Sequence, residues 1–454
     1  MLQSTPYFDL TMKTGIQMIM IYRRKVITLL MVILVIFFSF YHCKQSKVKD
    51  YNVVLIVIDA LRADHLPIYG YEKNTAPFLW ELSKQSVVFE NAFSASSWTS
   101  PGTASIFTSM YPYQHGVLMG LLAIRNAQKI DPNVKINRIP EEINTITEVM
   151  KKNGYQTYGV ADNLNIGERQ GFTQGFDKFE TYMYKEAPKV NQTIKNWKNQ
   201  LMANGKYFLY IHYMEPHAPY HPRKPWFKPN EDPDKERISA YDSEINFADL
   251  HIKELFELFA WDKNTILIIT ADHGEGLWDH GMMAHGKSLF REELHVPLIF
   301  HLPGEKIGRR ISTNASTIDI LPTVRDLLDL PQDKSDEGMS LVPLIKNQKH
   351  DLDNRNIYSY LWVKTGKKIE WKSTIYKNWH FIIQLPNSRQ LYFLLKDKKE
   401  EYNQFFNGYT TARLLEQRFE DFMKKSKKYR QKSSTYKLDE EKTNQLKSLG
   451  YVED

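Results

Sequence analysis

Short apolar runs that end at an acidic residue or a histidine recur along the chain. Residues 53–58 (VVLIVI) lead into Asp59, and residues 265–270 (TILIIT) lead into Ala271, Asp272 and His273. An unbroken apolar run of this length is typical of a strand that is buried on both faces, as in a parallel sheet. The same interpretation applies to weaker runs at 157–160, 207–210 and 296–300.

Segments with helical spacing separate these runs. Residues 143–153 precede the helix-stopping Gly154, and residues 244–259 form a long amphipathic stretch. Strands that alternate with helices predict an α/β fold with a doubly wound, mostly parallel sheet flanked by helices. Ligands of such sheets bind at the carboxyl ends of the strands, so the residues that follow the runs are expected to share one site. These residues include Asp59, Asp272, His273 and, after the run at 207–210, His217.

The pattern changes beyond residue 345. Residues 371–384 and 390–395 predict short antiparallel strands around a turn at 386–388. We therefore expect a catalytic domain over 51–350, a small C-terminal antiparallel-sheet subdomain over 351–410, and a helical basic tail over 411–454. The lysine-rich stretch 424–432 in that tail is more typical of a solvated helix or linker than of a membrane contact.

The N-terminal segment predicts a connection to the cell membrane. Arg23, Arg24 and Lys25 precede a charge-free run at 26–41, and counted to Cys43 the apolar segment has about 18 residues, close to a bilayer core in helical length. Two interpretations stay open: an uncleaved transmembrane anchor over 26–43, with residues 1–25 in the cytoplasm, or a lipoprotein signal cleaved before Cys43. Both put a linker at 44–50 and the catalytic domain on the periplasmic or extracellular side.

Charge and cysteine content restrict the possible functions and the sources of stability of the protein. The formal net charge of +7 is only weak evidence for an anionic substrate. The sequence shows neither zinc-finger spacing nor another nucleic-acid-binding motif. Cys43 is the only cysteine, so no internal disulfide supports the fold.

Several polar residues can carry chemistry at the expected site. Asp59, Asp272 and His273 are oxygen and nitrogen donors of the kind that hold a divalent cation. Thr99 precedes a helix that begins around Pro101, where it is either an N-cap or a nucleophile beside free backbone N–H groups. His217 and His285 are candidate general acids or oxyanion contacts, although a lone histidine is more often structural.

A series of segments, in order along the chain, resembles the sulfatase family of the alkaline phosphatase superfamily. Residues 53–71 are similar to its first metal-binding strand and loop, and residues 97–105 (SWTSPGTAS) with 108–116 are similar to its nucleophile signature. The remaining similar segments are 212–220 (HYMEPHAPY), 270–281, 285–286, 296–299, 319–323, 338–341 and 446–452. The resemblance implies an alkaline-phosphatase-like fold and an extracytoplasmic ester hydrolase or transferase.

Three positions depart from the family pattern. Thr99 stands where sulfatases carry the cysteine or serine that is oxidised to formylglycine, and a threonine would yield a ketone instead. Thr103 replaces the arginine of that motif, and Ala60 replaces one of two paired aspartates. By resemblance to superfamily members with a threonine nucleophile, Asp59, Thr99, Asp272 and His273 would hold one cation. His217 and His285 would act in catalysis and contact the transferred or leaving group, and Asn163 is a further candidate for substrate binding.

These observations leave three functions open. The first is a metal-dependent hydrolase or phosphoalcohol transferase that acts through Thr99 on a phosphate (di)ester, without formylglycine. The second is a sulfuric ester hydrolase that works without formylglycine. The third is an inactive binder of an anionic glycan or lipid. The presence of all the candidate metal-binding and catalytic residues together argues against this third function. The ligand types permit Ca, Mn, Mg or Zn as the single divalent metal ion.

The membrane interpretation predicts which side of the membrane the catalytic domain occupies. Protease added to intact spheroplasts should digest residues 50 onward, because both N-terminal readings place them outside the cytoplasm. Full protection of the domain until the membrane is permeabilised would contradict both readings.

Overall fold

The computed structural model describes residues 20, 22–31, 50–130, 136–203, 205–304, 306–365, 367–386, 388–426 and 428. The chain divides into two units, residues 1–49 and 50–454. In the first unit, residues 22–31 are helical, and no helix within the described ranges is long and apolar enough to cross a membrane. The predicted anchor at 26–43 lies mostly outside the described residues, so it stays a prediction.

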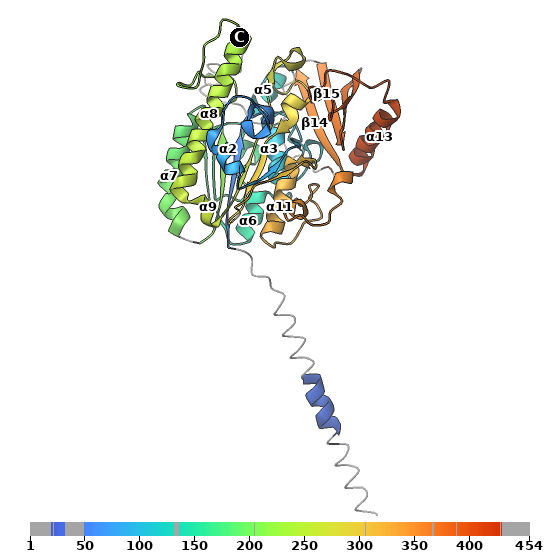
Figure 1. Cartoon of the computed structure of the whole chain (residues 1–454). Helices are drawn as coiled ribbons and strands as arrows, with labels where there is room; N and C mark the ends of the chain where they lie inside the picture. Colours follow the sequence, from blue (N-terminus) through green and yellow to red (C-terminus); the bar gives the residue numbers. More distant parts are fainter. Residues whose placement is uncertain are drawn as a thin grey trace, which may run out of the picture. The chain divides into compact units, whose positions relative to one another are not determined.

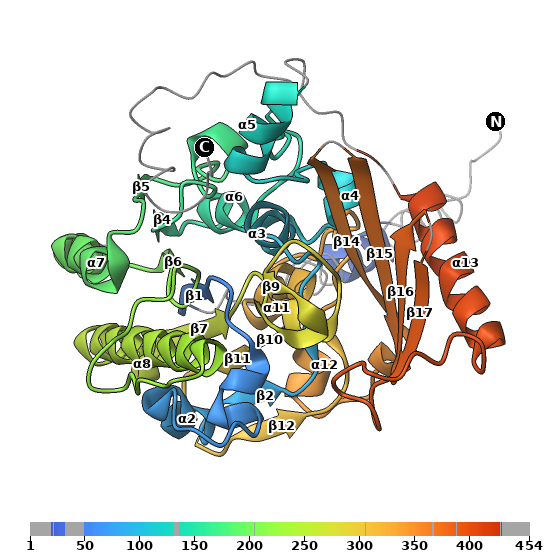
Figure 2. The same cartoon turned by 90° about the horizontal axis from the view of Figure 1, so that it is seen from above.

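An eight-stranded sheet forms the centre of the second unit (Figures 1 and 2). Its apolar runs form strands because their side chains are covered from both faces. In spatial order the strands are β12 (Arg309–Ile311), β2 (Val87–Phe89), β11 (Leu298–His301), β7 (Thr265–Thr270), β1 (Asn52–Ile58), β6 (Tyr207–Tyr213), β4 (Gln156–Ala161) and β5 (Lys178–Thr181).

The predicted strands are all present, and the sheet is mixed. β1 pairs in parallel with β6 and β7, and β4 pairs in parallel with β5 and β6. β11 runs antiparallel to both β7 and β2, a direction that its apolar run at 296–300 could not reveal. The predicted doubly wound, mostly parallel architecture is confirmed.

Helices cover both faces of the sheet (Figure 2). On one face, α2 (Pro77–Ser83), α7 (Glu186–Ala203) and α8 (Pro233–Phe259) bury their apolar side chains against β1, β6 and β7 in one continuous core cluster. The predicted helix at 244–259 is only the second part of α8, because the Asp232 carboxylate accepts the backbone N–H groups of Asp234 and Lys235 and starts the helix earlier. The other face carries α3 (Thr99–Thr108), α6 (Ile146–Lys152) and α11 (Ile320–Leu327).

Helix α3 packs unusually close to the strand edge. Its Phe107 ring lies 4.8 Å from the ring of Tyr210 on β6. At Gly102, an added Cβ would lie 2.5 Å from the carbonyl oxygen of Asp272, so only glycine fits there. This approach brings the start of α3 beside the segment that follows β7.

The C-terminal subdomain is a four-stranded antiparallel sheet covered by one helix, α13 (Tyr409–Lys425) (Figure 2). Its strands are β14 (Asn356–Thr365), β15 (Lys367–Tyr376), β16 (Trp379–Leu385) and β17 (Ser388–Phe393). The predicted strand at 371–384 is therefore two strands that reverse between Tyr376 and Trp379, and β14 was not predicted. Ala412 and Leu415 of α13 pack on Phe381, Ile383 and Leu391.

Short elements complete the unit. A three-stranded sheet contains β3 (Ala92–Phe93), β10 (His295–Val296) and β13 (Ala315–Ser316), and β8 (Gly276–Leu277) pairs with β9 (Met283–Ala284). The remaining α-helices of the unit are α4 (Pro112–His115), α5 (Leu121–Ile130), α9 (Trp261–Asn264), α10 (Arg291–Leu294) and α12 (Val342–Ile345).

Candidate active site

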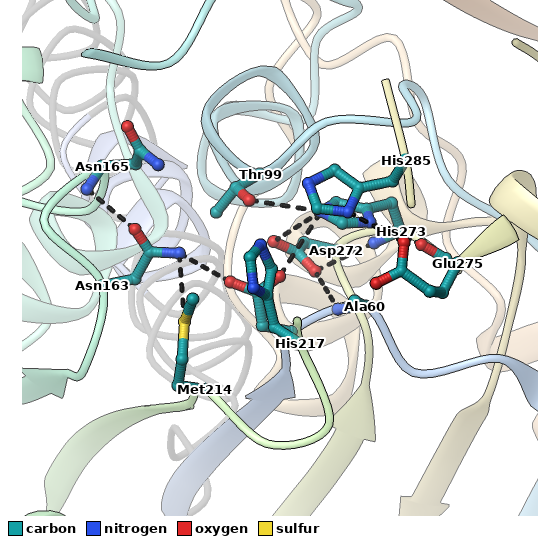
Figure 3. Close-up of polar contacts among 12 residues, drawn as sticks. Ala60, Thr99, Asn163, Asn165, Met214, His217, Asp272, His273, Glu275 and His285 are labelled. Carbon is teal, nitrogen blue, oxygen red and sulfur yellow. Dashed lines mark hydrogen bonds and ion pairs between the residues drawn. The ribbon is translucent and has the colours of Figure 1, made fainter. Parts of the chain in front are cut away.

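Polar side chains from four neighbouring strands and from α3 meet at one edge of the large sheet (Figure 3). Asp59 follows β1, Asp272 and His273 follow β7, and Asn163 follows β4. β6, which lies between β1 and β4, contributes His212 near its end. The structure therefore confirms the predicted convergence of these residues at the carboxyl ends of the strands.

Thr99 is the first residue of α3, and its hydroxyl turns toward this edge. Its Oγ1 lies 3.2 Å from Nε2 of His273, and the residue is 1% exposed (Figure 3). The N-cap position belongs to Trp98, whose side chain makes no cap hydrogen bond. The hydroxyl of Thr99 is therefore directed to the strand-end residues rather than used as a helix cap.

In each of the two aspartates, one carboxylate oxygen accepts hydrogen bonds and the other has no hydrogen-bond donor among the described residues. Asp59 Oδ2 accepts hydrogen bonds from Asn163 Nδ2 at 2.6 Å and from His212 Nε2 at 3.1 Å. Asp272 Oδ1 accepts the backbone N–H groups of His273 at 2.9 Å and Ala60 at 3.4 Å. Asp59 Oδ1 and Asp272 Oδ2 are buried and have no hydrogen-bond partner among the described residues.

The Nε2 atom of His273 lies near the same two oxygens, Asp59 Oδ1 and Asp272 Oδ2. Its Nδ1 lies 2.7 Å from the carbonyl oxygen of Gly274, so Nδ1–H donates there and Nε2 carries no proton in the neutral ring. Nε2 lies 3.4 Å from Asp59 Oδ1 and 3.8 Å from Asp272 Oδ2. Three acceptor atoms thus lie close together, and the Thr99 hydroxyl donates to one of them, His273 Nε2.

The electrostatics of this group favour a positive charge beside it. Burial and the neighbouring charge of Asp59 hold the pKa of Asp272 well above its usual range. Burial also opposes ionisation of Asp59, but His217, His212 and His273 outweigh it and lower its pKa. Burial lowers the pKa of His273 to about 3, which keeps its Nε2 lone pair available.

These residues fit a divalent cation. Asp59, His212 and Asp272 each offer an atom within 4.8 Å of the other two, and His273 and Thr99 lie against the same oxygens. Carboxylate oxygens and a neutral imidazole are ordinary ligands for such an ion. A cation would also satisfy the two carboxylate oxygens that the protein leaves without donors.

Two further histidines border the site. His285 Nδ1–H donates to Glu275 Oε1 at 3.0 Å, and the His285 ring lies 4.2 Å from that of His273. His217 Nδ1 lies 2.5 Å from the Ala218 carbonyl oxygen and 3.0 Å from the Tyr184 hydroxyl, and its ring is 4.8 Å from that of His285. In the His285 ring Nδ1 is occupied, which leaves Nε2 for a ligand, and the His217 ring is also held through its Nδ1.

The charge states of these groups follow from burial. Burial lowers the pKa of His285 to about 4 and also lowers that of His217. Burial raises the pKa of Glu275 to about 7. Both histidines are therefore neutral near pH 7 until an anion arrives beside them.

The C-terminal subdomain supports the loop that carries His285. The Glu400 carboxylate accepts the backbone N–H of Arg291 at 2.8 Å, and the Glu400 carbonyl oxygen accepts from His280 Nε2 at 3.0 Å. Glu400 itself bonds His380, whose Nε2 lies 2.7 Å from Ser373 Oγ. This Ser–His–Glu arrangement resembles a catalytic triad, but its three residues are at most 1% exposed, so we assign it a structural role.

The structure brings together Asp59, Thr99, Asp272 and His273 as expected, with His217 and His285 beside them. Asn163 is engaged differently from the expectation, because its amide holds Asp59 Oδ2 and the backbone of Asn165; its contact with substrate stays a prediction. The sequence analysis missed the positions of His212, Glu275 and Tyr184. His212 was detectable, since it lies within an apolar strand that ends at this edge.

Comparison with known proteins identifies the family of the chain. Residues 51–330 match the Sulfatase family, and residues 276–428 match the family "N-sulphoglucosamine sulphohydrolase, C-terminal". A Delta 4,5-hexuronate-2-O-sulfatase of Bacteroides thetaiotaomicron is 22% identical over 418 residues, covering 78% of this chain and 84% of that protein.

Solved structures share the fold. A 2-O GAG sulfatase superposes with a TM-score of 0.70 at 19% identity, over 85% of this chain and 95% of that one. A phosphonate monoester hydrolase of Agrobacterium radiobacter superposes with a TM-score of 0.67 at 16% identity, over 82% and 95% of the two chains. The fold is thus the alkaline-phosphatase-like sulfatase fold, and the chain belongs to the sulfatase family of ester hydrolases.

Proposed function

We propose that the chain hydrolyses a sulfate ester of a saccharide, with the unmodified Thr99 hydroxyl as the attacking group. The observation that carries the proposal is the buried Thr99 oxygen, 3.2 Å from His273 Nε2 and beside two carboxylate oxygens without donors. The sequence analysis put a phosphate ester first. The sulfatase relatives favour the sulfate ester, which it gave as the alternative.

Asp59, Asp272 and His273 would hold the divalent cation, with Thr99 at the same point. When bound, such an ion lowers the pKa of a nearby hydroxyl and stabilises charge on the ester oxygens. Asn163 and His212 position Asp59 by holding its other oxygen. The free backbone N–H groups at the start of α3 add a second contact for the ester oxygens.

The chemistry proceeds in two displacements. The Thr99 oxygen, having lost its proton to solvent, bonds to sulfur as the bond between sulfur and the leaving alcohol oxygen breaks. A protonated histidine, His285 or His217, gives its Nε2 proton to that oxygen. The same histidine then removes a proton from water, which attacks the sulfur, releases sulfate and restores Thr99.

Charge balance bears on the choice of ester. Two ionised aspartates and one divalent cation sum to zero, and the arginine that the family pattern has at position 103 is replaced by Thr103. A neutral buried site accepts a singly charged ester more readily than a doubly charged one. Sulfate monoesters and phosphate diesters carry one charge, whereas phosphate monoesters carry about two near pH 7.

A phosphate or phosphonate ester is the second candidate. It is favoured by Thr99, which lacks the oxidisable group of formylglycine enzymes, and by the fold shared with a phosphonate monoester hydrolase. In this reaction Thr99 would carry a phosphoryl group, and an alcohol could replace water as the acceptor. Transfer to an alcohol remains part of this second candidate only.

Metal addition should stabilise the folded protein. After chelation, titration with Ca²⁺, Mg²⁺, Mn²⁺ or Zn²⁺ should raise the melting temperature with at least one ion, by about 2.7 kcal/mol of free energy at a hundredfold excess over Kd. Differential scanning fluorimetry measures this shift. Asp272→Asn should abolish the rise and should not lower the metal-free melting temperature, because it removes the repulsion with Asp59.

The matched control for this experiment is Asp242→Asn. Asp242 is a buried carboxylate held by His65, Tyr71 and Lys73 away from the site, so its loss should lower the melting temperature but leave the metal response intact. An Asp272→Asn variant that responds to metal like the wild type would contradict the assignment.

A substrate panel separates the candidate functions. With the stabilising metal present, we expect turnover of aryl sulfate and of sulfated monosaccharides to exceed that of a phosphate monoester. Release of sulfate, phosphate and phenol is measured on the same preparation. Faster turnover of a phosphodiester or phosphonate would favour the second candidate, and turnover of none of these esters would favour an anion-binding protein without activity.

Substitution of Thr99 tests the nucleophile on whichever ester is accepted. Thr99→Ala should lower kcat by a factor on the order of 10³ or more, because the attacking oxygen is removed. Thr99→Ser should keep part of the activity, since it retains the hydroxyl. Steady-state kinetics and melting temperatures are measured together.

Thr108→Ala is the control on the same helix, because the Thr108 hydroxyl is buried and donates to the Ala104 carbonyl oxygen. It should lower the melting temperature and leave kcat near the wild-type value. If Thr99→Ala behaved like Thr108→Ala, the role of Thr99 would be structural only, on the scale of about 1 kcal/mol.

A further inference from the structure

A tyrosine hydroxyl holds the ring of His217 at the border of the candidate active site. The Tyr184 hydroxyl lies 3.0 Å from His217 Nδ1 and donates to the Ala218 carbonyl oxygen at 2.7 Å. Nδ1 also lies 2.5 Å from that carbonyl oxygen, which can only accept. Nδ1 therefore carries the proton of the neutral ring, and the phenol oxygen of Tyr184 and the Ala218 carbonyl oxygen both accept from it.

Tyr184 reaches His217 from a strained turn. Its φ is 48°, and Glu186 has a φ of 67°, so both lie in the left-handed region that residues other than glycine rarely adopt. Such a conformation persists only where the surrounding structure holds it, and strained residues of this kind cluster at functional sites. The contacts of this turn therefore show what keeps Tyr184 in place.

Two acidic side chains hold the residues that follow Tyr184. Asp162 accepts the backbone N–H of Lys185 on Oδ1 at 2.9 Å and that of Glu186 on Oδ2 at 2.7 Å. Glu215 Oε1 accepts the backbone N–H of Ala187 at 2.8 Å. These N–H groups lie at the start of α7, where a helix offers them no partner of its own and favours a negative charge. The two carboxylates thus fix the start of α7 and the turn that carries Tyr184.

The same sheet edge supplies both the acids and the histidine. Asp162 follows β4, whereas Glu215 and His217 follow β6, and the two strands pair with each other. A small cavity beside His217 is lined by residues that include Asp162, Tyr184, Glu186, Glu215, Glu244 and Arg223. The edge that gathers the candidate metal ligands therefore also holds the tyrosine that contacts His217.

We propose that Tyr184 is a positioning residue of the ester hydrolysis: its hydroxyl fixes the ring of His217, and Asp162 and Glu215 fix Tyr184. The proposal rests on the proposed function for the reaction that His217 serves. Because two acceptors hold the Nδ1–H group, a proton that the ring gains or gives up is exchanged at Nε2. Tyr184 thus prevents the ring from turning its protonated nitrogen toward the ester.

Kinetics of Tyr184→Phe test this role on whichever ester is accepted. The variant should lower kcat about tenfold or more and change KM little, because the ring of His217 is misplaced while ester binding is kept. In a His217→Ala background the same substitution should have almost no further effect, since Tyr184 acts through that ring. A purely structural role would instead give losses that add in the double variant.

A spectroscopic signature tests the contact without turnover. In NMR spectra of full-length protein with isotope-labelled histidine, the Nδ1–H proton of His217 should exchange slowly with water. Its signal is identified by its absence in His217→Asn. Tyr184→Phe should speed this exchange about fivefold, the scale of one hydrogen bond, and Asp162→Asn should speed it as well, because one backbone N–H of the turn loses its acceptor.

The matched control is Tyr182→Phe. Tyr182 belongs to the same segment, but its hydroxyl lies 2.9 Å from Thr193 Oγ1 rather than beside His217. This variant should keep the wild-type kcat and the wild-type exchange rate. Melting temperatures verify that all variants fold.

Unchanged kcat or unchanged Nδ1–H exchange in Tyr184→Phe, or additive losses in the double variant, would overturn the positioning role. Failure of the proposed function is recognised separately. A protein that cleaves no ester but shows faster exchange in Tyr184→Phe would contradict only the proposed function. A protein that cleaves esters equally well with and without the Tyr184 hydroxyl would contradict only the positioning role.

Discussion

The buried pair Asp59 and Asp272 is the constraint on which the rest of this site depends. Both carboxylates are fully buried, both leave one oxygen without a donor among the described residues, and the charge of Asp59 raises the cost of ionising Asp272. A protein retains such a pair only where something compensates the charge, because an unpaired buried carboxylate is strongly destabilising. His273 and Thr99 place two more acceptor atoms at the same point, so the fold concentrates negative potential where a cation fits.

The architecture brings these groups together by close backbone approaches. Gly102 lets α3 touch the carbonyl of Asp272, and Gly274 lets the chain after β7 pass against the backbone of Glu292. A side chain at either glycine would push apart the helix that carries Thr99, the segment that carries Asp272, or the loop that carries His285. The C-terminal sheet adds support through Glu400, which holds α10 and His280. Precision at the strand edge therefore depends on residues that do no chemistry themselves.

The site and its neighbouring cavity are both rich in acidic side chains. The strand edge gathers the carboxylates of Asp59 and Asp272, and the cavity beyond His217 is lined by Asp162, Glu186, Glu215 and Glu244 together with Arg223.

The apolar runs and the polar residues that follow them predicted the local features of the fold. They predicted the buried strands, the shared edge, and the convergence of Asp59, Asp272 and His273, because a buried strand appears as an apolar run and the residues after it lie at the sheet edge. The place of Thr99 in this group came from the resemblance to the sulfatase family. Other features depend on which strands become neighbours in the folded chain. These are the direction of β11, the reversal between β15 and β16, and the hydrogen bonds of His212 and Asn163 to Asp59. The acidic cavity was decided by tertiary structure alone, since Asp162, Glu215 and Glu244 come from three separate segments, and the Oε2 atoms of Glu215 and Glu244 lose their water partners only when packing buries them.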